Sequence, residues 1–108
     1  MSTFYIKEND TVPSIRATLQ NGSGDPVDLV NATVRFHMRA IGSTSAVVDA
    51  DATVVSDAGG IVQYDWDAAD TADIGSFQAE FEVTYPDGTV ETFPSSGYIR
   101  VEITDDIA

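Results

Sequence analysis

The chain has 108 residues, contains no cysteine, and carries 18 acidic against five basic residues, which gives a formal net charge of −13. The missing cysteines exclude disulfides and thiolate metal sites, and the charge argues against binding to nucleic acid or anionic membranes, which repel an acidic surface. The length predicts one domain over residues 1–108, and no apolar run is long enough for a signal peptide or a membrane span, so we expect a soluble, intracellularly made protein.

Apolar and polar residues alternate in short segments that recur about every ten residues, with turn-forming residues between them, as is typical of β-sandwiches. A single helical turn is expected in the alanine- and aspartate-rich residues 67–73, and a brief extended piece at 27–29. The expected strands, in chain order, are residues 4–7, 14–20, 33–40, 46–56, 61–66, 76–85, 89–93 and 98–104.

The clearest strands are residues 33–40 and 76–85, because each has one apolar and one polar face. The second places Phe77, Phe81 and other apolar residues on one side, and Gln78, Glu80, Glu82 and Thr84 on the other. About seven or eight such strands and no real helix predict an all-β, immunoglobulin-like antiparallel β-sandwich. This fold class favours a binding or assembly role over catalysis.

A series of short motifs follows in order along nearly the whole chain. They are FYIK at 4–7, NDT at 9–11, PS at 13–14, GDPVDL at 24–29, ATVRFHMR at 32–39, VQYDW at 62–66, DT at 70–71, GSFQAEF at 75–81 and DGTVETFP at 87–94. The series resembles the N-terminal domain of tailed-phage baseplate upper proteins.

The resemblance implies a non-enzymatic virion component without a cofactor. In such baseplates this domain is the attachment module, and a C-terminal extension carries the receptor-binding proteins. Because the sequence ends at Ala108, soon after the last expected strand, we expect a free-standing copy that is made in the host cytoplasm and docks onto the capsid, tail or baseplate. Its partners would be other virion structural proteins, bound in several symmetric copies.

Arg35, His37 and Arg39 form a basic stripe on the polar face of residues 33–40. One interpretation is structural: if the strand 76–85 is a neighbour, the stripe pairs with Glu80 and Glu82. The other is functional, with the stripe docking against an acidic partner surface. Both interpretations remain open at this stage.

The candidate contact residues are Phe4, Tyr5 and Ile6 in the first strand, the stripe residues Arg35, His37 and Arg39, and Tyr98 after the loop that begins at Pro94. The alternative function is a glycan-binding adhesion module of the virion, in which an exposed aromatic such as Tyr98 stacks on a sugar. Trp66 ends the apolar row of residues 61–66, so we expect it in the core.

Neither a metal site nor a catalytic site is predicted. The aspartates at 49, 51, 65, 67, 70 and 73 offer oxygen ligands, but they lack the spacing of a calcium loop, and we interpret them as solvated surface. His37 is the sole histidine, lies mid-strand between two arginines, and has no nucleophile elbow near it in sequence.

Overall fold

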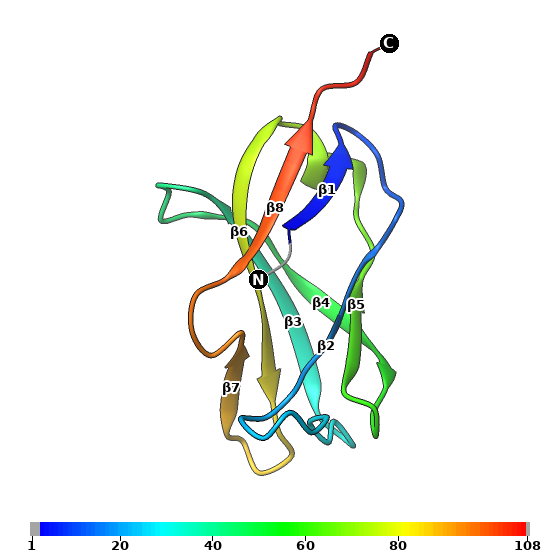
Figure 1. Ribbon diagram of the computed structural model, residues 1–108, viewed down its shortest axis with the longest axis vertical. Helices are drawn as coiled ribbons and strands as arrows, with labels where there is room; N and C mark the ends of the chain where they lie inside the picture. Colours follow the sequence, from blue (N-terminus) through cyan, green and yellow to red (C-terminus); the bar gives the residue numbers. More distant parts are fainter. Residues whose placement is uncertain (1–2, 108) are drawn as a thin grey trace.

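The computed structural model describes residues 3–107, which form eight strands and one 3₁₀ turn. None of the described residues belongs to a helix long and apolar enough to cross a membrane. The elements are β1 (Thr3–Lys7), β2 (Ile15–Thr18), β3 (Thr33–Ala40), β4 (Ala46–Ser56), β5 (Ile61–Tyr64), η1 (Ala68–Thr71), β6 (Gly75–Thr84), β7 (Val90–Phe93) and β8 (Ile99–Thr104), as labelled in Figure 1.

The strands make one nearly closed, barrel-like sheet in the order β1-β8-β6-β3-β4-β5-β2, with β7 paired to the second half of β6 (Figure 1). The long strand β4 serves both layers, because its residues 46–52 pair with β3 and its residues 53–56 with β5. The prediction of an all-β, immunoglobulin-like fold is confirmed. One detail differs: β1 runs parallel to β8, so the sheet is mixed instead of purely antiparallel.

The observed bounds follow the predicted periodicity closely for the long strands. β3 and β4 match residues 33–40 and 46–56, and β6 is shifted by one residue. β2 is shorter than the predicted 14–20, because the Leu19 N–H donates to Gly60 and its carbonyl accepts from Val27, outside the ladder. The predicted extended piece at 27–29 forms no strand; an isolated bridge between Gln20 and Pro26 lies just before it.

An aromatic cluster fills the space between the two layers. The ring of Phe36 stacks on Tyr64 at 4.6 Å and meets Trp66 edge-on at 5.5 Å and Phe81 at 5.1 Å. Phe36 is completely buried, and full burial of such a side chain contributes roughly 1.5–3 kcal/mol. The apolar faces predicted for β3, β5 and β6 therefore meet in one core, and the prediction of a buried Trp66 is confirmed.

Candidate interaction surface

The polar side chains of five strands share one outer face of the molecule, which we call the outer face of β1-β8-β6-β3-β4. The pairing registers align them in rows that cross the strands. One row is Glu80, His37 and Asp49, and the next is Glu82, Arg35 and Asp51. Side chains that the sequence placed on separate polar faces are thus brought together.

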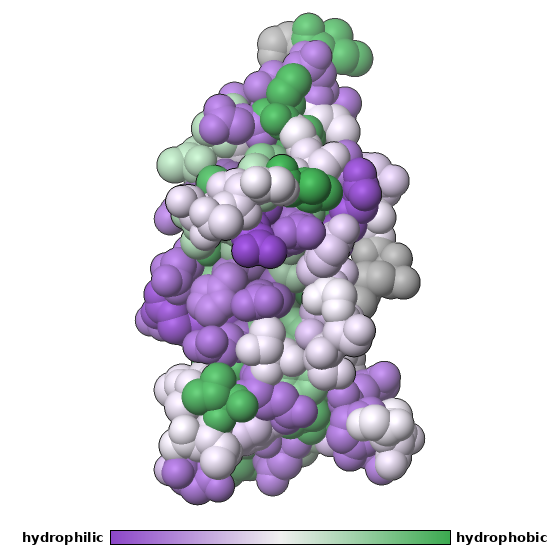
Figure 2. All heavy atoms as spheres, turned by 90° about the vertical axis from the view of Figure 1, so that its left-hand side faces the viewer, coloured by the Kyte–Doolittle hydropathy of each residue, from purple (hydrophilic) through white to green (hydrophobic). Residues whose placement is uncertain are grey.

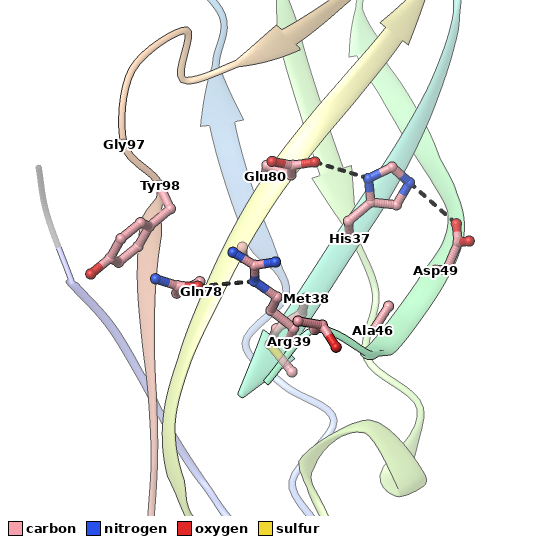
Figure 3. A pocket seen from close by; sticks show the side chains of 11 residues that line it. His37, Met38, Arg39, Ala46, Asp49, Gln78, Glu80, Gly97 and Tyr98 are labelled. Atoms are coloured by element: carbon pink, nitrogen blue, oxygen red, sulfur yellow. Dashed lines mark hydrogen bonds and ion pairs between the residues drawn. The ribbon is translucent and has the colours of Figure 1, made fainter. Parts of the chain in front are cut away.

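His37 lies between two carboxylates. Its Nδ1 is 3.2 Å from Glu80 Oε2 on β6, and its Nε2 is 3.2 Å from Asp49 Oδ1 on β4 (Figure 3). A neutral imidazole has one N–H and can donate to only one of them, whereas the protonated ring donates to both. The structural interpretation of the stripe required His37 to pair with Glu80, and this pair is present. His37 also has a second acidic partner, Asp49, which that interpretation did not include.

Arg35 bonds to β4 and not to Glu82, the partner expected from the sequence. Its Nη1 donates to Asp51 Oδ1 at 2.8 Å, and its Nε and Nη2 donate to Asp49 Oδ1 at 3.0 and 2.9 Å. The forked guanidinium fits two carboxylates spaced two residues apart on one strand, which a single glutamate does not offer. The hydrogen bond from Arg35 lowers the pKa of Asp49 below its ordinary value.

A hollow of about 360 Å³ opens on the outer face beside this network. Residues 44 and 46, in and after the β3–β4 loop, and residues 97 and 98, at the end of the β7–β8 connection, lie at its margins (Figure 3). Between these margins, Arg39 Nε on β3 donates to Gln78 Oε1 on β6 at 3.0 Å. Tyr98 is 38% exposed, so its ring is open to a partner that enters the hollow.

Arg39 differs from the other arginines of this face in its partner. Arg35 and Arg100 form ion pairs with carboxylates, whereas within residues 3–107 no carboxylate forms an ion pair with Arg39. Its hydrogen-bond partner among the described side chains is the amide oxygen of Gln78. Arg39 is therefore available to a charged or polar partner.

Charge is distributed unequally over the molecule. The outer face of β1-β8-β6-β3-β4 is nearly neutral, with four of the five basic residues and only five of the 18 acidic ones. These are Lys7, Arg35, Arg39 and Arg100, against Asp49, Asp51, Glu80, Glu82 and Glu102. The rest of the chain keeps thirteen acids and one base, Arg16.

The surface around the hollow is mostly hydrophilic. The side that carries β7, β8 and the β3–β4 loop, on the left of Figure 1, faces the viewer in Figure 2. There, hydrophilic side chains cover the middle of the molecule and hydrophobic ones form separate small groups. Recognition at this face would consequently rest on polar and charged contacts around an occasional aromatic ring.

Five of the seven contact residues predicted from the sequence lie together on this face: Tyr5, Arg35, His37, Arg39 and Tyr98. Tyr5 is 66% exposed. The other two alternate to the inner side of β1. Ile6 is only 4% exposed, and the ring of Phe4 lies 5.9 Å from that of Trp66, so Ile6 is a core residue and not a surface contact.

Four of the six aspartates interpreted as solvated surface, Asp49, Asp51, Asp65 and Asp70, have protein partners. Asp65 accepts hydrogen bonds from Ser14 and Gln63, and Asp70 accepts from the Tyr64 hydroxyl at 2.6 Å and the Asp67 N–H at 2.9 Å. Across the part of the chain that the structure describes, no group of three or more histidine, aspartate and glutamate side chains is placed to hold a metal ion.

Sequence reasoning missed Gln78, Arg100 and Asp49 as members of the surface. Gln78 and Asp49 both alternate outward on their strands, a signal that was available, but only the register shows that they lie opposite Arg39 and His37. Arg100 bonds to Glu102 on its own strand at 2.7 Å. To predict that these residues belong to the surface, one would need to know which strands are neighbours.

Comparison with known proteins adds the family. The model of the BppU N-terminal domain matches residues 3–106. Among solved structures, the crystal structure of CopC from Methylosinus trichosporium OB3b is similar, with a TM-score of 0.56 and 13% identity over 100% of this chain and 89% of that one. At that identity the likeness concerns the fold alone. No curated protein matches the sequence.

Proposed function

Because the chain belongs to the family of BppU N-terminal domains, the structural domains of phage baseplate upper proteins, we propose that it is a non-enzymatic assembly module of a tailed-phage virion. It docks through the outer face of β1-β8-β6-β3-β4 onto another virion structural protein of the baseplate, tail or capsid. The observation that carries this proposal is the gathering of five predicted contact residues on the one face whose charge is nearly balanced.

Charge favours this face over every other part of the molecule. Elsewhere thirteen acids and one base repel any acidic neighbour, whereas here arginines and carboxylates alternate. Complementary charges at an interface give orientation and partner choice more than affinity. A mixed-charge face also tolerates neighbouring acidic copies, as the symmetric, multi-copy arrangement of a virion requires.

Arg39 and Tyr98 are the proposed anchors of the docked partner. Arginine and tyrosine are over-represented among the residues that dominate binding energy at interfaces. Both line the hollow, and Arg39 forms no ion pair with any described residue that docking would have to break. In this proposal residues 1–108 act as one domain whose place is the assembled particle.

The test uses a matched pair of charge reversals. Arg39 and Arg16 both donate to a glutamine on the neighbouring strand, Gln78 and Gln63, but Arg16 lies on β2, outside the outer face of β1-β8-β6-β3-β4. Arg39→Glu should reduce incorporation into virions by at least about tenfold, the loss of one interface anchor, while Arg16→Glu has little effect. Quantitative mass spectrometry of purified virions measures both. Equal incorporation of the two variants would contradict docking through this face.

A second function is favoured by the make-up of the hollow. An aromatic ring, Tyr98, lies beside the polar side chains of Gln78, Arg39 and Glu80, an arrangement that also suits a sugar ring (Figure 3). A glycan array decides between the two functions. A reproducible hit that is lost in Tyr98→Ala and kept in Tyr5→Ala, an exposed tyrosine outside the hollow, would favour host adhesion.

A further inference from the structure

The barrel-like sheet is open along one side, between β2 and β7. β2 ends the strand order and pairs only with β5, and β7 pairs only with β6. A groove of about 300 Å³ separates these two free edges. Its lining is mainly apolar, with Ala17 and Leu19 on the β2 side and Phe93, Pro94 and Ile99 on the other.

The opening results from the short reach of β1. β8 pairs with the first half of β6 and β7 with the second half. β1 runs parallel to β8 and pairs with residues 100–104, and its first described residue, Thr3, lies opposite Arg100, so the described part of β1 does not reach the level of β7 (Figure 1). In the lower half of this view β7 therefore has no neighbour that corresponds to β1, which lies beside β8 in the upper half.

Backbone groups on both edges point away from their paired strands, toward the open side of the sheet. The Leu19 N–H donates to Gly60 on the β5 side, so the alternation of a strand turns the amide and carbonyl of Arg16 and Thr18 to the free edge of β2. The same argument applies to β7. The Tyr85 N–H donates to Thr89, so Val90 and Thr92 direct their backbone groups away from β6. Such a row of donors and acceptors is a ready template for pairing with another extended backbone.

We propose that this groove receives one extended segment of a different protein, which adds to the free edge of β2 as a strand and completes the sheet. Its side chains alternate between apolar residues, which cover Leu19, Phe93 and Ile99, and outward residues that include lysine or arginine. This second attachment is independent of docking through the outer face, since the two surfaces share no residue.

Charge complementarity selects a basic partner rather than a second copy of this chain. The groove lining carries no charged side chain, and near its edges two exposed acids, Glu91 on β7 and Asp25 beside the Gln20–Pro26 bridge, outnumber the single base, Arg16 on β2. A second copy would bring another net charge of −13 to this edge and has only five basic residues in 108. A basic strand meets no such repulsion.

Hydrogen exchange of the free protein gives the first test. The amides of Thr18 and Thr92 should exchange far faster than those of Ala17 and Leu19, which face β5. Equal protection of Thr18 and Ala17 would show that the edge is covered and would overturn the proposal.

A panel of synthetic peptides gives the second test. Peptides of about nine residues, in which valine, isoleucine or phenylalanine alternates with lysine, arginine or threonine, are titrated while amide signals are followed by NMR. At least one should bind with a Kd below about 1 mM and shift the amides of Thr18 and Thr92. The inference would be overturned if no peptide binds. It would also be overturned if the amide shifts are confined to the outer face or report only association of the protein with itself.

Two further experiments show whether the peptide binds by backbone pairing or only by charge attraction. N-methylation of the peptide at alternate residues should weaken binding by about tenfold or more, and it leaves the protein untouched. In the protein, Thr18→Pro removes the outward N–H and should do the same, while Thr18→Ala, which keeps it, changes affinity less than about twofold. Full binding of the N-methylated peptide would exclude strand addition.

Discussion

The hydroxyl of Tyr64, at the end of β5, donates to the carboxylate of Asp70 in η1 at 2.6 Å. The same carboxylate accepts the N–H of Asp67 at 2.9 Å. One acidic side chain thereby holds the 3₁₀ turn against the ring that stacks on Phe36 at the centre of the core. The segment between β5 and β6 is positioned by this contact.

Loss of the Tyr64 hydroxyl should destabilise the protein. Tyr64→Phe keeps the stacked ring but removes the donor, at a cost of about 0.5–1.5 kcal/mol in the free energy of unfolding. Urea denaturation followed by Trp66 fluorescence measures the change. Tyr5→Phe, an exposed ring on β1, is the matched control and should leave the free energy unaltered; an equal loss in both variants would exclude the Asp70 contact as the cause.

Stability should fall in alkaline solution. Burial and the nearby Asp70 raise the pKa of Tyr64 well above its ordinary value, and burial with the hydrogen bond to Glu91 raises the pKa of Tyr85 to about 12. An unfolded tyrosine titrates near pH 10, so the folded state binds these protons more tightly. The contribution is fully present below about pH 10 and is lost as the pH rises through the folded-state pKa values.

Thermal unfolding between about pH 9 and pH 12 checks this pH dependence. The Tm should decline more steeply for the native chain than for Tyr64→Phe, which no longer has one of the two raised groups. Identical slopes for the two proteins would contradict the assignment of the alkaline loss to Tyr64.

Gly60 should not tolerate a side chain. Its φ is +65°, and a Cβ there would lie 2.7 Å from the carbonyl oxygen of Leu19 and 3.0 Å from Val27 N. Gly60→Ala should therefore cost more than the roughly 1–3 kcal/mol of an unfavourable backbone conformation alone. Gly24→Ala separates the two effects, because Gly24 has a φ of +83° but open space around it. Chemical denaturation of both variants should show the larger loss for Gly60.

Salt should raise the melting temperature. The formal net charge of −13 destabilises the compact state by self-repulsion, and thirteen of the acids lie outside the balanced outer face. Between about 10 mM and 1 M NaCl the screening length shrinks from roughly 30 Å to 3 Å, which removes most of that repulsion. A rise of several degrees is expected in calorimetry; a flat profile would mean that the acids are locally compensated.

The amino-acid pattern was sufficient for the long central strands and insufficient for their neighbours. Strict alternation in β3 and β6 determines which side chains are buried, so Phe36, Phe81 and the outward stripe were predicted correctly. The partner of Arg35 was not, because alternation gives the face of a residue but not the strand beside it. Asp49 and Asp51, which the sequence pattern indicates only as solvated surface, are its ion-pair partners.

Non-local pairing explains the remaining differences. The parallel contact of β1 with β8 joins the two ends of the described chain, and no local signal in either strand indicates its direction. The prediction of Ile6 as a contact residue differs from the structure, in which pairing of β1 with β8 places its side chain in the core. The free edges of β2 and β7 follow from the same pairing and were equally invisible in the sequence.

The continuity of β4 across both layers has a mechanical consequence. Since its first part is bonded to β3 and its second to β5, the layers are joined by an unbroken covalent chain as well as by side-chain packing. A force applied to one layer is transmitted to the other along the backbone of β4. The layers therefore cannot separate unless the backbone hydrogen bonds of β4 to β3 or to β5 are broken first. A particle component built this way resists shear.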